Sequence, residues 1–124
     1  AARLDELVES LVPKRRPLRR ILVHHGGKAF LVPVERIDRI EAERNYVRVH
    51  AGGASYLVRS SIGSIAERLD PARFLRINRS DIVRLDAVKE MHPWFHGDYR
   101  VVLLDGTTLM WSRRYRAKTE GEFG

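Results

Sequence analysis

Short runs of apolar residues, many of them alternating with polar ones, recur along the chain and are separated by residues that favour turns. This spacing is typical of β-strands that bury one face. Three pairs of runs flank a glycine-containing turn and predict hairpins over residues 21–32, 46–59 and 99–111. The last hairpin has Asp105-Gly106 at its turn, a strong hairpin signal. A further strand is predicted over residues 37–43.

The stretch 74–84, FLRINRSDIVR, is the one around which we expect the chain to be organised. Its residues alternate as in a half-buried strand, with Phe74 and Arg76 on one parity and Leu75 on the other. Between its two apolar runs lies Asn78-Arg79-Ser80-Asp81, which is rich in turn formers and in hydrogen-bonding groups. The stretch therefore predicts either a polar connection between strands or a site that contacts a partner.

Helical spacing is confined to short segments. Residues 1–12 place Leu and Val at helical intervals, so they predict a short amphipathic helix before Pro13. Residues 62–69 predict a second short helix. Residues 85–91 read as a continuing strand, and residues 112–118 leave the sheet as a short helix.

These patterns predict a mainly β, antiparallel domain of about nine or ten short strands. It carries one internal helix, capped by Ser60 or Ser61, besides the N-terminal helix. No repeat and no alternation of strand and helix is present, so a parallel nucleotide-binding sheet is not expected. We divide the chain into a helical and basic linker (1–20), a folded domain (21–118) and a tail without periodicity (119–124).

Composition narrows the choice of partner. The 124 residues are 44% hydrophobic and 31% charged, which is globular composition for one domain. The net charge of +7 favours a polyanionic partner, nucleic acid first and an anionic membrane surface second. There is no cysteine, which excludes disulfides and thiolate metal sites and fits the cytoplasm. The chain has no long apolar run or signal peptide, and its Ala1 start indicates a fragment or a lost initiator.

Polar connections at three strand ends carry residues suited to DNA. They are Glu43-Arg44-Asn45-Tyr46, Asn78-Arg79-Ser80, and the run from Ser112 to Arg116. Arginine makes bidentate hydrogen bonds to guanine and asparagine to adenine in the major groove. Each connection alone is equally compatible with DNA contact and with an ordinary turn or a solvated charged surface. Three of them, each at a strand end, favour contact with nucleic acid.

The basic run from Lys14 to Arg20 is compatible with two roles. It is either a solvated linker or a segment that lies along a phosphate backbone and adds affinity without sequence information. The aromatic group of Trp94, Phe95 and Tyr99 also has two readings. It is either a stacking platform for single-stranded nucleic acid or, as we favour, part of the core or a subunit contact.

An enzyme is not expected. The candidate general bases or metal ligands are histidines, and His92 and His96 are four residues apart. Pro93 and Gly97 argue against a helix that would align them. The motifs of metalloproteases, phosphate-binding loops and serine hydrolases are absent from the sequence. We predict no catalytic residue, no metal and no cofactor.

The order of three segments resembles a known family. IEAERNYVRVH is followed by a long segment that contains FLRINRSDIVRLDAVKEM, and the chain then closes with LLDGTTLMWSRRY. From about residue 21 to 118 this resembles the LytTR-type DNA-binding domain of bacterial transcriptional regulators. The resemblance implies an elongated arrangement of antiparallel sheets that presents loops, rather than a recognition helix, to double-stranded DNA.

The resemblance also implies partners and site residues. Such domains typically follow a receiver domain in response regulators of two-component systems, and they bind tandem sites, so we expect an upstream signalling module and a homodimer on DNA. The implied base-reading residues are Arg44, Asn45, Tyr46, Asn78, Arg79, Arg113 and Arg114. The implied or expected phosphate-binding residues are Lys14, Arg15, Arg16, Arg76, Ser80, Ser112 and Arg116.

The sequence departs from the family pattern at two positions. The family commonly has His where Asn78 stands, and an aromatic or small polar residue where Asp81 stands. An acidic Asp81 near phosphates is unfavourable unless it is paired, for which Arg79 or Arg84 is the expected partner. The alternative to DNA binding is a non-enzymatic β module that binds protein or an anionic membrane surface.

Overall fold

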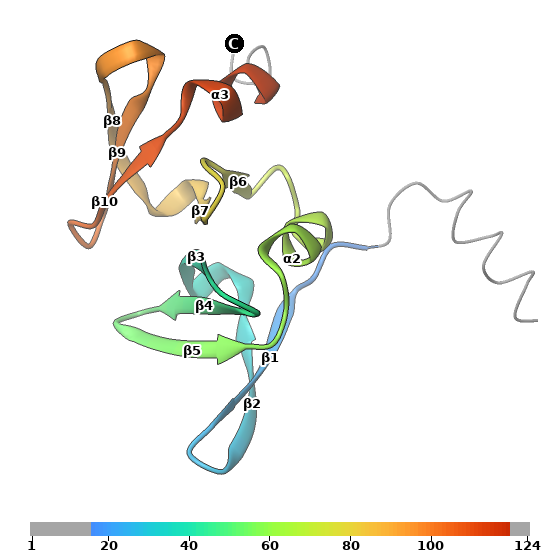
Figure 1. The fold of residues 1–124 in the computed structure, drawn as a ribbon. Helices are drawn as coiled ribbons and strands as arrows, with labels where there is room; N and C mark the ends of the chain where they lie inside the picture. Colours follow the sequence, from blue (N-terminus) through green and yellow to red (C-terminus); the bar gives the residue numbers. More distant parts are fainter. Residues whose placement is uncertain (1–15, 120–124) are drawn as a thin grey trace, which may run out of the picture.

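A computed structural model describes residues 16–119, which fold into ten strands and two α-helices (Figure 1). The strands are β1 (Arg20–His25), β2 (Lys28–Pro33), β3 (Ile37–Glu43), β4 (Tyr46–Ala51), β5 (Ala54–Val58), β6 (Phe74–Arg76), β7 (Asp81–Arg84), β8 (Val88–Pro93), β9 (Tyr99–Leu103) and β10 (Thr108–Trp111). The helices are α2 (Ile62–Arg68) and α3 (Arg113–Thr119). The mainly β prediction is confirmed. The N-terminal helix expected over residues 1–12 lies outside the described residues, and the second described helix is C-terminal.

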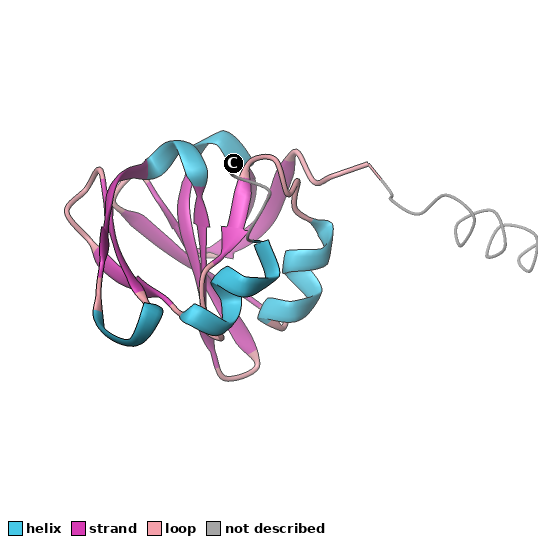
Figure 2. Cartoon of the chain, turned by 90° about the horizontal axis from the view of Figure 1, so that it is seen from above, coloured by secondary structure: helices cyan, strands magenta, loops and turns pink. Residues whose placement is uncertain are grey.

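Three antiparallel sheets follow one another along the molecule. β1 and β2 form a two-stranded sheet, the order β5-β4-β3-β7-β6 forms a five-stranded sheet, and β10-β9-β8 forms a three-stranded sheet. Figure 1 shows the two-stranded sheet at one end and the three-stranded sheet at the other. The view from above shows both helices on one side of the strands (Figure 2). All three predicted hairpins are present with tight turns.

The β6–β7 hairpin separates two apolar cores. Phe74 and Ile82 pack into the core formed by the two-stranded sheet, the five-stranded sheet and α2. Leu75 and Val83, on the opposite face, pack into the core of the three-stranded sheet. Each such buried side chain contributes about 1.5–3 kcal/mol. The expectation of a half-buried strand was therefore wrong, because a strand between two cores buries both of its faces.

Two other expectations need correction. Residues 85–87 form a 3-10 turn instead of a strand, and this turn carries the chain from β7 into β8. Trp94 and Phe95 are 44% and 68% exposed, so they are not core residues, whereas Tyr99 packs against the core of the three-stranded sheet. Trp94 and Phe95 lie in the β8–β9 loop, where the left-handed backbone of His96 (φ 57°) turns the chain and leaves both rings outside the sheet. A subunit contact of this aromatic group stays a prediction.

The N-cap of α2 provides a test of local stability. The Ser61 hydroxyl oxygen accepts a hydrogen bond from the Ser64 backbone N–H at 3.0 Å. We expect Ser61→Ala to lower the free energy of unfolding by about 1 kcal/mol, measured by urea denaturation. Ser60→Ala is the matched control, since the Ser60 hydroxyl donates to the Ser61 carbonyl and accepts no helix N–H. Equal losses in both variants would contradict the capping role.

Candidate nucleic-acid interface

Backbone hydrogen bonds bring the three predicted polar connections together. The Ala42 N–H, near the end of β3, donates to the Ser80 carbonyl at 2.8 Å. The Ser112 N–H, at the start of α3, donates to the Ile77 carbonyl at 2.9 Å. The β6–β7 turn is therefore hydrogen-bonded to β3 near its end and to the β10–α3 junction, so the three connections are neighbours in the fold.

The β3–β4 turn holds three exposed side chains. Arg44, Asn45 and Tyr46 are exposed, and Arg44 has left-handed backbone geometry with φ 58°. Non-glycine residues adopt this geometry infrequently, which marks a tight two-residue turn. Within residues 16–119 these three side chains make no hydrogen bond or ion pair, so all three are available to a partner.

An ion pair neutralises the carboxylate next to this turn. Arg48 donates to both carboxylate oxygens of Glu43, with Nε at 2.7 Å and Nη2 at 3.1 Å. This hydrogen bonding lowers the pKa of Glu43, so the carboxyl group stays ionised. Arg48 also donates to the Ser55 hydroxyl, which fixes its orientation. Glu43 consequently presents a paired charge, rather than a free one, beside the exposed Arg44.

Asn78 is engaged within the fold. Its Nδ2 donates to the Met110 carbonyl at 2.7 Å and to Asp81 at 3.1 Å, while its Oδ1 accepts from the Ser80 N–H at 2.7 Å. The side chain is partly buried. These bonds shape the β6–β7 turn and tie it to β10. Bidentate contact between Asn78 and adenine would require these hydrogen bonds to break. Base reading by Asn78 therefore stays a prediction, and it would sacrifice the bonds that shape the turn.

The partner of Asp81 differs from the expectation. The Asp81 carboxylate lies 3.7 Å from Arg39 on β3, and it accepts from Asn78. Arg84 instead donates to the Ile37 carbonyl at 2.7 Å. The pairing with Arg79 or Arg84 was therefore wrong, because β7 pairs with β3 and places Asp81 beside the Arg39 strand. Within residues 16–119 the exposed Arg79 side chain has no partner.

Three of the expected phosphate-binding residues also have partners inside the chain. Arg76 Nη2 donates to the Arg79 carbonyl at 2.9 Å. The Arg116 guanidinium stacks 4.0 Å from the Tyr99 ring centre and donates to the Gly97 carbonyl. The Ser112 hydroxyl accepts from the Tyr115 N–H at 3.3 Å and so caps α3. No local pattern signals the contacts of Arg116, whereas a serine just before a helix is itself the local signal of an N-cap.

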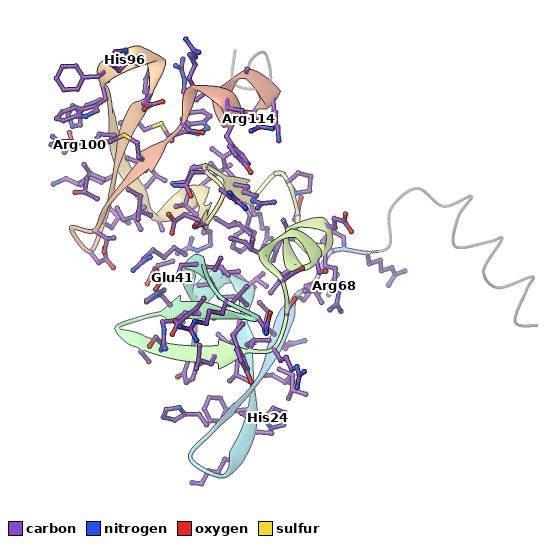
Figure 3. All side chains as sticks on the ribbon, in the orientation of Figure 1. His24, Glu41, Arg68, His96, Arg100 and Arg114 are labelled. Atoms are coloured by element: carbon purple, nitrogen blue, oxygen red, sulfur yellow. The ribbon has the colours of Figure 1, made fainter. Side chains whose placement is uncertain are left out.

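The first turn of α3 presents Arg113 and Arg114, and both are exposed. Figure 3 shows Arg114 on α3. The Arg113 backbone N–H donates to the Asp98 carboxylate at 2.8 Å. A Cβ at Gly97 would lie 2.8 Å from Arg113 Cδ, so a larger residue there would displace the arginine. Gly97 and Asp98 are thus positioning residues that the sequence analysis did not identify.

The structure describes only part of the basic run from Lys14 to Arg20. Lys14 and Arg15 lie outside the described residues, and Arg16 is exposed at their beginning. Within residues 16–119 no group of three or more His, Cys, Asp or Glu side chains is placed to hold a metal ion. Over the same residues no helix is long and apolar enough to cross a membrane.

The fold and the site define a small, mainly β domain in which three neighbouring connections carry exposed arginines. Residues 27–121 match the LytTr DNA-binding domain, and the chain belongs to this family. The family comprises DNA-binding domains of transcriptional regulators and is not enzymatic. The resemblance drawn from the sequence is confirmed.

Individual proteins show the same relationship. The chain is 30% identical over 90 residues to the sensory transduction protein LytT of Bacillus subtilis, covering 73% of this chain and 37% of that protein. It is 26% identical over 102 residues to the transcriptional regulatory protein LytR of Staphylococcus aureus, covering 82% and 42%. The chain thus spans about two-fifths of the length of these relatives.

A solved structure has the same fold. It is the LytTr DNA-binding domain of a Bacillus cereus protein described as a methyl-accepting/DNA response regulator. The TM-score is 0.78 at 20% identity, and the alignment covers 86% of this chain and 98% of that one. At this identity the likeness supports the fold, and the assignment of individual residues depends on the geometry described above.

Proposed function

We propose that this domain binds double-stranded DNA with sequence preference, using loops in place of a recognition helix. The observation that carries the proposal is the pair of backbone hydrogen bonds that joins the β6–β7 turn to the end of β3 and to the β10–α3 junction, which makes three polar connections neighbours. Each connection ends a strand, and each presents an arginine without a side-chain hydrogen bond or ion pair within residues 16–119: Arg44, Arg79 and Arg114. Guanidinium groups match guanine edges in the major groove and phosphates alike.

The proposed contacts fall into two groups. Bases are read by Arg44, Asn45, Tyr46, Arg79, Arg113 and Arg114, which are all exposed. Phosphates are bound by Lys14, Arg15, Arg16 and Ser80. Asn78, Arg76, Ser112 and Arg116 hold the loops in place through the hydrogen bonds described above. Direct contact between these four residues and DNA is secondary in this scheme.

The relatives extend the proposal to the whole protein. Because the two relatives are named as a sensory transduction protein and a transcriptional regulator, we infer that this domain works beside an upstream receiver or other signalling module in the cytoplasm. Tandem DNA sites would then bring two copies together as a homodimer on DNA. Half-sites one helical turn apart, about 10 base pairs, would place both copies on one face of the duplex.

The direct test is selection from a pool of random duplexes at near-physiological salt, followed by sequencing of the bound fraction. Enrichment of a short motif, repeated at about one helical turn, is the expected result. Tight binding without enrichment would leave a charge-driven, non-specific module. Absence of binding even at low salt would overturn the proposal.

One observation favours a second candidate function. Trp94 and Phe95 are exposed at the β8–β9 loop, with their ring centres 5.2 Å apart, and Arg100 lies 5.0 Å from the Trp94 ring centre. An exposed aromatic pair beside a cation suits a protein partner or an anionic membrane surface. Binding to phosphatidylserine vesicles without preference among DNA sequences would support this alternative.

The basic run gives a prediction about salt dependence. We expect replacement of Lys14, Arg15 and Arg16 by Gln to lower affinity for all duplexes and to reduce the log–log salt slope by up to about 2.7, since each neutralised phosphate contributes about 0.9. Fluorescence anisotropy across a salt series measures this slope. Deletion of residues 1–20 is avoided because the Leu18 N–H donates to the Arg68 carbonyl.

The matched control replaces three exposed basic residues elsewhere by Gln: Lys28, Arg36 and Lys89. This variant has the same change in net charge, so the long-range attraction of the whole protein falls equally. An unchanged slope in the first variant, or the same loss in both, would refute phosphate contact by the basic run.

A further inference from the structure

One edge of β2 borders a hollow of about 540 Å³. Within residues 16–119 β2 pairs with β1 alone, so no strand is hydrogen-bonded to its other edge. Four consecutive residues of β2, Phe30 to Pro33, line the hollow together with Gly52, Ala54 and Tyr56 of the β4–β5 hairpin. Because neighbouring side chains of a strand point to opposite faces, this run of lining residues shows that the hollow follows the free edge of β2.

The register of the β1–β2 hairpin identifies the backbone groups at this free edge. The two glycines between His25 and Lys28 both have positive φ, 60° and 73°, as in a two-residue type I′ turn. The residues that flank such a turn form a hydrogen-bonded pair, and hydrogen-bonded pairs then alternate with pairs that are not bonded. The N–H and C=O groups of Ala29 and Leu31 therefore point away from β1, toward the free edge.

Exposed apolar side chains gather at the same edge. Leu22 and Leu31 are direct cross-strand partners on one face of the hairpin, and they are 52% and 58% exposed. Phe30 points to the other face, where its ring lies edge-on to Tyr56 with the ring centres 5.4 Å apart. Phe30 is still 36% exposed. A strand added beside β2 would remove apolar surface from water on both faces.

We propose that the free edge of β2 binds an extended segment of a partner protein, in which apolar and acidic residues alternate, as an added strand. Ala29 and Leu31 would supply the backbone hydrogen bonds, and apolar side chains of the segment would lie against Leu31 or Phe30. The hollow lies at the Asp38 end of β3, whereas Arg44 follows the other end. A partner bound here would leave the proposed DNA contacts free, and the proposal does not depend on them.

The preference for acidic residues follows from the charges around the edge. Lys28 begins β2, Arg36 lines the hollow, and Arg20 is the cross-strand partner of Pro33. All three cations are exposed, and within residues 16–119 none of them has an ion pair. The hollow is also lined by Asp38, but that carboxylate accepts from the Gly52 N–H at 3.2 Å and lies 3.9 Å from Arg84.

A second copy of the chain suits this edge less well. Two β2 strands paired with each other would bring two sets of these cations together, and like charges opposite one another across a ladder are unfavourable. Lys28 and Pro33, at the two ends of β2, are residue types that discourage pairing between identical edges.

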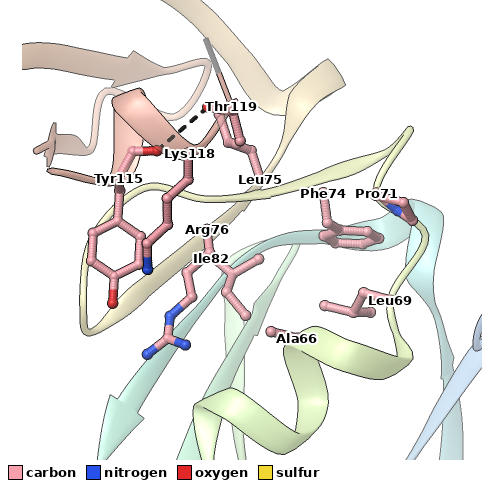
Figure 4. A pocket seen from close by; sticks show the side chains of 10 residues that line it. All are labelled: Ala66, Leu69, Pro71, Phe74, Leu75, Arg76, Ile82, Tyr115, Lys118 and Thr119. Atoms are coloured by element: carbon pink, nitrogen blue, oxygen red, sulfur yellow. Dashed lines mark hydrogen bonds between the residues drawn. The ribbon is translucent and has the colours of Figure 1, made fainter. Parts of the chain in front are cut away.

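The edge strand β6 shows how the fold covers an edge that it does not leave open. A hollow of about 300 Å³ beside β6 is lined on one side by Tyr115 and Lys118 of α3 (Figure 4). The Arg76 guanidinium of β6 lies 5.5 Å from the Tyr115 ring centre. Covering an edge with a helix is a common protection against added strands. No residue of α2 or α3 lines the hollow along β2, so that edge is accessible to a partner.

The test uses the 124-residue chain and a capped octapeptide of alternating valine and glutamate as the probe. Amide hydrogen exchange measured by NMR is the readout, because an added strand protects edge amides and a side-chain contact does not. Without peptide, the Ala29 and Leu31 amides should exchange fast, and the Phe30 and Val32 amides, which face β1, should exchange slowly. With peptide at about ten times its Kd, exchange at Ala29 and Leu31 should slow by about tenfold.

Modified peptides separate strand addition from attraction by charge. The octapeptide with lysine in place of glutamate should not bind. Two further versions of the acidic peptide carry N-methyl groups on alternate amides, either at every valine or at every glutamate. Since alternate N–H groups of a strand point to opposite edges, one version should lose binding and the other should keep it.

A pair of variants places the site on the protein. Leu31→Glu should weaken binding of the acidic peptide by roughly tenfold, because it puts a like charge at the edge. Leu104→Glu is the matched control, since Leu104 is 67% exposed in the β9–β10 turn and the change in charge is the same. It should bind the peptide as the unaltered chain does. Amide spectra of both variants check that they remain folded.

Several results would overturn the proposal. They are bound peptide without protection of Ala29 and Leu31, equal binding of the lysine peptide, equal binding of the two methylated peptides, and equal losses in the two variants. Protection that appears without peptide and grows with protein concentration would identify a second copy as the occupant. Protection without peptide at every concentration would identify residues 1–15 of the same chain instead.

Discussion

Arg79→Ala is expected to weaken binding to the selected duplex by roughly 5- to 150-fold while affinity for random DNA changes far less. The range corresponds to about 1–3 kcal/mol for one bidentate base contact. Arg79 is exposed and free of side-chain partners within residues 16–119, so its removal takes away a contact with DNA and leaves the fold intact. Anisotropy titrations against specific and random duplexes at one salt concentration measure the difference.

Two further variants make this result decisive. Arg36→Ala removes an exposed arginine at the opposite end of β3 from the Arg44 turn, and it should lower both affinities slightly and equally. Arg79→Lys keeps the charge but loses the planar, bidentate donor. If the lysine variant binds both duplexes as well as the unaltered domain does, Arg79 contacts a phosphate and not a base.

The parts of the fold that could be predicted are those that local residue order determines. Glycine pairs and Asp105-Gly106 specify tight turns because the turn geometry involves only neighbouring residues. Ser61 predicts the start of α2 for the same reason. The exposed members of the site could be predicted as well, since Arg44 and Arg114 lie at strand or helix ends that the pattern locates.

The rest depended on contacts between residues far apart in the chain. Asn78 and Met110 are separated by 32 positions, and Arg84 and Ile37 by 47. No local pattern shows that a polar side chain at a turn will form such a hydrogen bond within the fold. The burial of both faces of the β6–β7 hairpin also depends on distant contacts. The three-stranded sheet has to pack against strands that already contribute to another core.

Asn78→Ala is expected to lower the free energy of unfolding by about 2 kcal/mol, because three hydrogen bonds of a partly buried side chain are lost. The Met110 carbonyl would lose its bond to the β6–β7 turn, and Ser80 would lose its local acceptor. Specific DNA affinity should fall as well, since the turn that presents Arg79 is no longer fixed against β10. Urea denaturation and DNA titration together measure both effects.

Asn45→Ala is the matched control, because it makes the same chemical change at an exposed turn residue without a hydrogen bond within residues 16–119. We expect it to leave unfolding unchanged and to reduce specific DNA binding alone. The two variants thus separate a positioning role from direct DNA contact. Asn78→Ala should lose both stability and specific DNA binding, and Asn45→Ala should lose specific DNA binding alone. Reduced specific binding in Asn78→Ala with unaltered stability would show that Asn78 contacts a base. It would contradict the positioning role of the hydrogen bond between Asn78 and the Met110 carbonyl.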